Sequence, residues 1–331
     1  MGTDISKLAV DQKGNIYVED NSLLKIHVLN PHGDYLYAIG RRGRGPGEFE
    51  RLGVNSIFIY RDTLYVLDNF QKRLSEFRLN KPKLIQTINF PNIKFKDFVG
   101  YLSQVYPLAG KRYEGIFRDT PFFPDQKIIV SILDRNLVPI DSVIREFPRK
   151  LPFAYYDKSN RSMMVFPNTR NLVPETHITF GPKGLLYITQ SKRLHIGVFN
   201  RKGQKTRNIL SNYVPPSLTQ HDIDSLLRDK DFKLKSYFKK ALKQYKVKIP
   251  GHWPAIQDLL VDNQGRCWVE LVNPGKYKQI WWVFNTKGKP KWKFRLPGDV
   301  TIYTVHNNEV YAIQKDKGKF PRILRYRVNG F

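Results

Sequence analysis

The chain has 331 residues, of which 41% are apolar and 26% are charged, so it is long enough to bury a large core. It contains no run of about 18 apolar residues, which excludes a membrane-spanning helix in this sequence. A single cysteine, Cys267, excludes an internal disulfide and a metal site built from several cysteines. The net charge of +27, from 56 basic and 29 acidic residues, favours encounters with anionic partners.

A short unit recurs along the chain: an apolar strand, a turn of polar residues or glycine, and a second strand centred on an aromatic residue. Its clearest copies span 8–18, 178–188 and 259–269, with looser copies around Tyr65 and Tyr311. The aromatics Tyr17, Tyr65 and Tyr113 are spaced 48 residues apart, which is typical of the blades of a β-propeller. Such a unit buries its apolar face only by stacking on its neighbours.

Two further strands follow in the better copies, joined by four-residue turns that begin with Asn and end with Gly, at 30–33, 200–203 and 285–288. Each unit is therefore predicted to be a four-stranded antiparallel meander. The whole chain, 1–331, is predicted to be one all-β domain, a six-bladed β-propeller. Its blades are expected at 5–49, 53–90, 98–147, 176–211, 255–297 and 300–328.

Three stretches depart from this pattern. Residues 148–175 have no period and are expected to form a long loop, whereas 212–254 carries a helical stripe and is predicted to be a helical insertion between blades four and five. The sixth unit supplies only three strands. Since the chain begins almost directly on a strand without a signal peptide, we expect sequence upstream of residue 1 to complete this blade.

The segment between the first two blades is rich in glycine. Gly40, Gly43, Gly45, Gly47 and Phe49 match the blade ending of the NHL-repeat family, so the chain resembles the six-bladed propellers of that family. The full motif occurs in one blade, and the proline expected after the phenylalanine is absent. The resemblance is greatest to bacterial envelope members, which implies a periplasmic or cell-surface location.

Two groups of basic residues are candidate anion sites. Arg41, Arg42 and Arg44 lie in the glycine-rich segment, where arginines can hold a carboxylate or phosphate through two hydrogen bonds, although solvated side chains are the simpler interpretation. Lys239, Lys240 and Lys243 lie late in the helical stripe of the insertion and form a candidate basic surface, although solvated lysines on an insert packed over the propeller rim are the simpler interpretation. No Walker or Rossmann pattern accompanies the glycines, so no nucleotide cofactor is predicted.

The axial channel is the other candidate site, because the inner strands of a propeller surround it. Their starting residues are polar: Asp4, Asn55, Gln104, His177, Gln257, Asp258 and Thr301. His177 and His252 precede inner strands and are candidate ligand contacts together with Asp258, although structural roles are the alternative for both histidines. The seven histidines show no zinc-binding spacing, and the set contains few carboxylates, so no metal is predicted.

The predicted function is a non-catalytic binding or scaffold module, expected to be a monomer without cofactors. Its basic face would recognise an anionic polymer, either an acidic glycan or nucleic acid, or a protein. One alternative is a hydrolase or lyase with its site in the axial channel, which two or more inward carboxylates near His177 and Asp258 would favour. Another is an RNA-binding propeller, which requires Trp292 and Phe294 to be exposed beside the lysines of 289–295. Alternation along a strand instead predicts that these two aromatics are buried.

Overall fold

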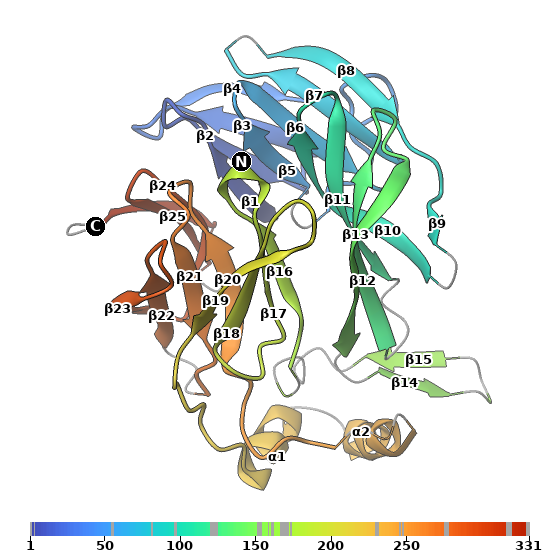
Figure 1. Cartoon of the computed structure of the whole chain (residues 1–331), viewed down its shortest axis with the longest axis vertical. Helices are drawn as coiled ribbons and strands as arrows, with labels where there is room; N and C mark the ends of the chain where they lie inside the picture. Colours follow the sequence, from blue (N-terminus) through green and yellow to red (C-terminus); the bar gives the residue numbers. More distant parts are fainter. Residues whose placement is uncertain are drawn as a thin grey trace.

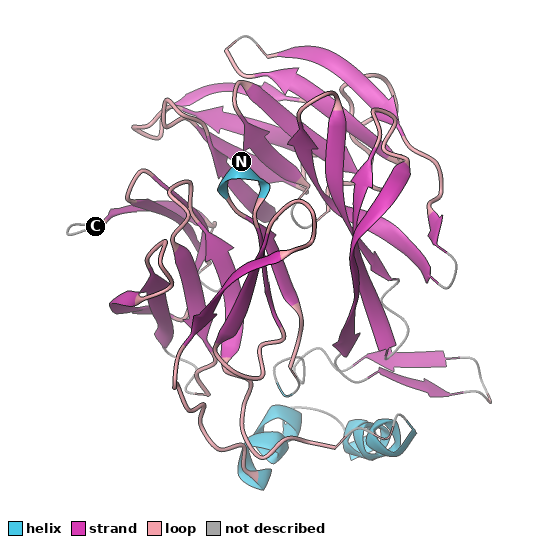
Figure 2. Ribbon diagram, viewed as in Figure 1, coloured by secondary structure: helices cyan, strands magenta, loops and turns pink. Residues whose placement is uncertain are grey.

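A computed structural model gives the fold of the chain (Figures 1 and 2). It describes residues 2, 4–53, 56–80, 82–95, 98–119, 125–150, 154–157, 159, 162–165, 172, 174–228, 232–244, 246, 248–274, 278–315 and 320–328. Six antiparallel sheets follow one another around a ring, and each sheet keeps its strands in chain order. The predicted six-bladed propeller is confirmed.

The first three blades occupy the N-terminal half. Blade one contains β1 (Ile5–Val10), β2 (Ile16–Asp20), β3 (Lys25–Leu29) and β4 (Tyr35–Ile39). Blade two contains β5 (Ile57–Tyr60), β6 (Thr63–Asp68), β7 (Arg73–Arg78) and β8 (Lys83–Asn89). Blade three adds a short strand to the usual four and contains β9 (Lys94–Phe95), β10 (Phe98–Leu108), β11 (Arg112–Asp119), β12 (Asp125–Leu133) and β13 (Pro139–Lys150).

The last three blades complete the ring. Blade four contains β16 (His177–Phe180), β17 (Leu186–Thr189), β18 (His195–Phe199) and β19 (Lys205–Leu210), with the 3-10 turn Pro182–Gly184 after β16. Blade five contains β20 (Ile256–Val261), β21 (Cys267–Leu271), β22 (Lys278–Phe284) and β23 (Pro290–Pro297). Blade six has three strands among the described residues: β24 (Val300–His306), β25 (Glu309–Gln314) and β26 (Arg322–Arg327).

An acidic side chain at the first turn explains part of the repeat. In blade one, Asp11 Oδ1 accepts the backbone N–H groups of Lys13 and Asn15, both at 2.9 Å. Asp262 in blade five does the same for Gln264 and Arg266, and its other oxygen accepts the indole N–H of Trp268 at 2.9 Å. One aspartate side chain therefore both closes the turn and holds the aromatic residue of the second strand.

The cores lie between blades, as the repeat requires. Each pair of neighbouring blades shares one cluster of buried apolar residues, including the closing pair of blades six and one. In five blades the second strand sends an aromatic ring toward the next blade, and these rings belong to Tyr17, Tyr65, Tyr187, Trp268 and Tyr311. Burying large rings in this way contributes much of the stability of a core.

Blade three breaks this rule. Tyr113 packs in the cluster shared with blade two, and its hydroxyl donates to Glu76 of that blade at 2.6 Å. The position that faces blade four is held by Glu114, the next residue along the strand. The equal spacing of Tyr17, Tyr65 and Tyr113 in the sequence therefore does not reflect equivalent places in the ring.

The connections after blades three and four carry additional elements. Part of the segment expected to be a loop is a hairpin, β14 (Ala154–Asp157) paired with β15 (Ser162–Val165), which corrects that prediction. The predicted helical insertion contains α1 (Gln220–Arg228) and α2 (Phe232–Gln244). Figure 1 places both helices and the hairpin together outside the ring, and a separate apolar cluster holds them.

Candidate functional site

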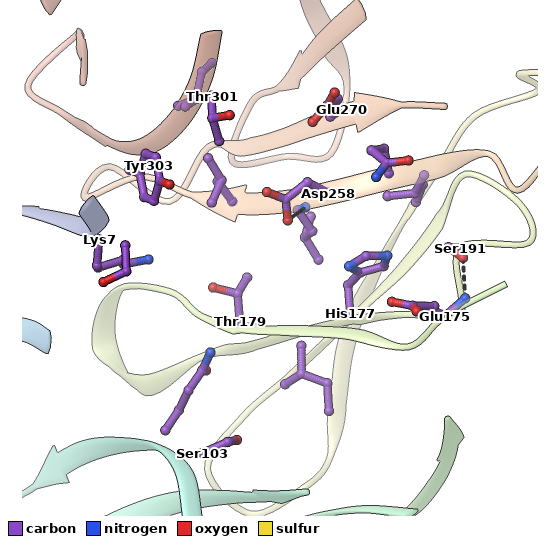
Figure 3. A pocket seen from close by; sticks show the side chains of 18 of the residues that line it. Lys7, Ser103, Glu175, His177, Thr179, Ser191, Asp258, Glu270, Thr301 and Tyr303 are labelled. Carbon is purple, nitrogen blue, oxygen red and sulfur yellow. Dashed lines mark hydrogen bonds between the residues drawn. The ribbon is translucent and has the colours of Figure 1, made fainter. Parts of the chain in front are cut away.

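A cavity of about 1510 Å³ lies on the propeller axis. The inner strands of five blades, β1, β10, β16, β20 and β24, contribute to its lining, together with the loops that lead into inner strands, such as those at Arg51 and Pro254. Figure 3 shows the side chains of 18 of the lining residues and labels ten of them. A cavity of this size exceeds the usual range of small-molecule sites, which is about 300–1,000 Å³.

Bulges in the inner strands shape this lining. In four of them the register against the second strand shifts by one residue, and the extra residues at these bulges are Ser6, Ser103, Gln257 and Tyr303. In a regular strand, neighbouring side chains point to opposite faces, but a bulge redirects one of them. Consequently, successive residues such as Ser6 and Lys7, or Gln257 and Asp258, both line the cavity.

Two carboxylates stand side by side on the blade-five wall. Asp258 on β20 and Glu270 on β21 are directly opposite in the strand register, and both line the cavity. Residues paired in this way have Cβ atoms roughly 5 Å apart, and like charges in such pairs are destabilising. Burial, followed by the charge of Asp258, raises the pKa of Glu270 to about 8. Glu270 therefore holds a proton at neutral pH.

Lys7 on β1 brings an amino group to the same cavity. Burial lowers the pKa of its ammonium group, while the charges of Asp258 and Glu19 partly oppose that effect. Glu19 lies behind the lining, where the hydroxyls of Ser6 and Ser56 donate to its two oxygens at 2.6 and 2.7 Å. Burial raises the pKa of Glu19 to about 7, although both hydroxyls and Lys7 lower it.

The blade-four wall carries His177 and Glu175. Both line the cavity, and the backbone N–H of Glu175 donates to Ser191 Oγ at 2.8 Å, which fixes the chain as it enters β16 (Figure 3). Basic residues of other blades, Arg51 and Arg118, also belong to the lining. Three acids of the lining, Glu175, Asp258 and Glu270, belong to blades four and five, and Asp4 precedes β1. Bases come from blades one to three (Lys7, Arg51 and Arg118) and also from blades five and six (Lys278 and Lys315).

The channel residues predicted from the sequence are largely brought together. Asp4, Gln104, His177, Gln257, Asp258 and Thr301 all line the axial cavity. Asn55 lies outside the described residues. His252 is not part of the lining, because it forms an isolated β-bridge with Ser217 in the connection that carries the helices.

Sequence reasoning missed Lys7, Glu175 and Glu270. Glu270 lies on a second strand, which normally faces a neighbouring blade rather than the axis, so its residue type alone gave no signal. Lys7 follows Ser6 at the bulge, and strict alternation assigns only one of the two to the channel.

The arginines of the glycine-rich segment lie outside the cavity lining. Arg41 Nε donates to Glu48 at 2.7 Å, and Arg44 donates to Glu50 through Nε and Nη2 at 3.0 and 2.8 Å. Both arginines therefore have acidic partners within their own loop, and Arg42 is exposed. Gly40 has a positive φ of 77°, and a Cβ there would collide with the buried ring of Phe49. The glycine thus permits the tight crossing between the first two blades.

The lysine surface and the basic strand are exposed. Lys239, Lys240 and Lys243 lie on the solvent side of α2. On β23, Trp292 and Phe294 pack against the core shared by blades five and six, while the neighbouring Lys291 and Lys293 are exposed. Both rings pack against the core as predicted but are only partly buried, and on this strand they do not form the exposed aromatic platform that RNA stacking requires.

Three further observations concern the described residues. These residues contain no group of three or more His, Cys, Asp or Glu side chains arranged to hold a metal ion. Neither helix in the described part of the chain is long and apolar enough to cross a membrane. Cys267 is buried in the core between blades four and five, and burial raises the pKa of its thiol.

Comparison with known proteins supports the fold. Residues 3–122 match the family profile DUF5128, described as a 6-bladed β-propeller. A comparison with curated proteins found no match. A solved structure of a DUF4221 family member from Bacteroides vulgatus is similar with a TM-score of 0.55 and 12% identity, covering 99% of this chain and 94% of that one.

Other solved structures are less similar. A protein of unknown function from Bacteroides caccae has a TM-score of 0.49 and 11% identity, covering 92% of this chain and 86% of that one. Virginiamycin B lyase from Staphylococcus aureus has a TM-score of 0.40 and 14% identity, covering 99% and 85%. At such identities a similarity concerns the fold alone, and the chain is thereby placed among six-bladed β-propellers.

Proposed function

We propose that this protein is a binding module whose ligand occupies the axial cavity and carries both a cationic and an anionic group. The observation that supports the proposal most is the carboxyl pair of Asp258 and Glu270 in the same cavity as Lys7. A ligand ammonium group beside this pair would replace the proton on Glu270. The anionic end of the ligand would face Lys7 on blade one.

The axial cavity is a better candidate than the glycine-rich loop. Arg41 and Arg44 already pair with Glu48 and Glu50 on an exposed surface, where additional ion pairs contribute little, about 0–1 kcal/mol each. Within the cavity, water is partly excluded, and charges interact more strongly there than on the surface. The recognition predicted for the basic face is therefore reassigned to a ligand of mixed charge in the channel.

The test is a series of ω-amino acids, from glycine to aminooctanoate, titrated by calorimetry into the intact protein. Their length varies at constant charge, so we expect affinity to peak at one length, which measures the separation of the two walls. Alkylamines and alkanoates of that length lack one charge and should bind at least about tenfold more weakly, a loss of about 1.4 kcal/mol. Equal binding of all lengths would contradict the proposal.

Two cavity variants locate the binding. Asp258→Asn and Lys7→Gln should each weaken binding of the best ligand, whereas Asp224→Asn and Lys202→Gln should not. Asp224 and Lys202 are matched controls because both are exposed and distant in sequence from the cavity lining. Unaltered affinity in both cavity variants would exclude this cavity as the site.

A second candidate function is acid–base catalysis in the same cavity. Two or more inward carboxylates near His177 and Asp258 are the arrangement expected of an enzyme, and Glu175, Asp258 and Glu270 line the cavity together with His177. The pKa of Glu270 is raised to about 8 and that of Lys7 is lowered, and such perturbed groups are common where proton transfer occurs. Mass spectrometry of the ligand after incubation separates the two functions. A converted ligand, with conversion lost in Glu270→Gln, would support an enzyme; an unchanged ligand supports binding alone.

A further inference from the structure

A second cavity of about 410 Å³ lies between the hairpin β14–β15 and helix α2, outside the propeller ring. Its lining includes Tyr155, Tyr156, Asp157, Lys240, Lys243 and Gln244. This volume falls within the usual range for small-molecule sites of about 300–1,000 Å³. The groove is separate from the axial cavity, with which it shares no lining residue.

The two walls of the groove are joined to each other. The side-chain amide of Gln244 on α2 donates to the backbone oxygen of Tyr156 on β14 at 3.3 Å. The rings of Tyr155 and Tyr237 pack with their centroids 5.3 Å apart. Behind them, Phe238 and Ala241 of α2 belong to the buried cluster that holds the helices. The helix and the hairpin therefore present one composite surface.

The charge of the groove is predominantly positive. Helix α2 (Phe232–Gln244) contains no acidic residue, and Lys240 and Lys243 are exposed where they line the groove. The ammonium group of Lys240 lies 5.8 Å from the ring centroid of Tyr155 and 5.3 Å from that of Tyr237. Asp157, the acid in the lining, accepts two hydrogen bonds from Ser159 through one oxygen.

We propose that this groove binds a small organic anion with a flat apolar ring. The tyrosines supply an amphipathic wall for the ring, since aromatic side chains favour stacked or edge-on contacts with other rings. Lys240 and Lys243 lie one helical turn apart, on the same side of α2, where both can approach one carboxylate or sulfonate. This site is independent of the function proposed for the axial cavity.

The experiment uses anilinonaphthalene sulfonate, a fluorescent aromatic anion, as the probe. Its affinity for the full chain is compared with that for Lys240→Gln/Lys243→Gln and for a control, Lys202→Gln/Lys287→Gln, in which two exposed turn lysines are replaced. We expect the groove variant to bind about fivefold more weakly, as the loss of two exposed charge contacts predicts, and the control to bind like the unaltered protein.

Competition distinguishes an anion site from a merely apolar surface. Benzoate should displace the probe, whereas benzyl alcohol, which has the same ring without charge, should not. Equal displacement by both, or unchanged probe affinity in the groove variant, would overturn the proposal. If the groove variant fails to fold, Lys240→Arg/Lys243→Arg replaces it: this variant keeps both charges and must still bind the probe. The competition between benzoate and benzyl alcohol in the unaltered protein also still shows whether the groove selects an anion.

Discussion

The interface between blades one and two and that between blades three and four each contain a buried glutamate on a second strand, but the two environments differ. Glu19 is fully buried and receives hydrogen bonds from Ser6 and Ser56. Glu114 is equally buried, yet neither of its carboxyl oxygens has a hydrogen-bond partner among the described residues. Accordingly, burial raises the pKa of Glu19 to about 7 and that of Glu114 to about 8.

The comparison shows how stability changes when a buried glutamate replaces the aromatic side chain between two blades. Blades one and two close over Tyr17, whereas the corresponding place between blades three and four is occupied by Glu114. A carboxyl that binds its proton more tightly in the folded than in the unfolded chain lowers stability as pH rises. For Glu114 this loss extends from its ordinary pKa of 4.5 up to about 8. We therefore expect the interface between blades three and four to lose stability as the solution becomes alkaline.

The largest effect on stability is expected when Glu19 loses its hydrogen-bond donors and so resembles Glu114. Replacing both donors, Ser6→Ala/Ser56→Ala, leaves a buried carboxylate without its hydroxyl partners and raises the Glu19 pKa further above about 7. We expect a loss of about 2–4 kcal/mol in the free energy of unfolding at pH 8.5, measured by urea denaturation. At pH 5, where Glu19 is protonated in either protein, the loss should be smaller. An equal loss at both pH values would show that ionisation of Glu19 is not the cause.

The opposite experiment removes the ionisable carboxyl of Glu114 from the interface between blades three and four. Glu114→Gln is nearly isosteric and cannot ionise, so its stability relative to the unaltered protein should rise by about 1–3 kcal/mol between pH 5 and pH 8.5. Chemical denaturation at a series of pH values measures this difference. The matched variant Glu50→Gln, at a partly exposed position, should show no such rise. A pH profile parallel to that of the unaltered protein would contradict the assignment.

The smallest effect concerns Arg201, a positive charge that acts on Glu114. Arg201 of blade four lowers the Glu114 pKa, although burial outweighs it. Arg201→Gln should therefore raise that pKa and reduce stability at pH 8.5 by about 0.5 kcal/mol, a value typical of partly exposed ion pairs, with little change at pH 5. Lys202→Gln, in the same turn, is the control. Equal losses in both variants would point to the turn itself rather than to Glu114.

The fold could be read from the sequence because its determinants are local and repeated. Asp11 and Asp262 close equivalent turns, and the Asn–Gly turns at 30–33 and 285–288 join the outer strands. These signals specify meanders of known length, and stacking follows from their apolar faces. The hairpin at 154–165 was missed because it has no repeat partner elsewhere in the chain.

The candidate site was only partly predictable. Inner-strand polarity identified His177 and Asp258, since these residues lie at the start of apolar strands. The roles of Lys7 and Glu270 depend on bulges and on strand register, which are properties of the paired sheet rather than of one segment. Likewise, the shift by one residue that turns Tyr113 away from blade four is visible only when the neighbouring blades are present.

The bulges of the inner strands let some residues line the channel while other residues hold the sheet together. A bulge residue such as Gln257 lines the axial cavity where the register of the strand pair shifts by one residue, so replacing its side chain leaves the ladder of backbone hydrogen bonds in place. Mutations there can alter what the channel accepts while the cores between blades stay as they are. A ring built in this way is free to acquire new specificities without first being made more stable.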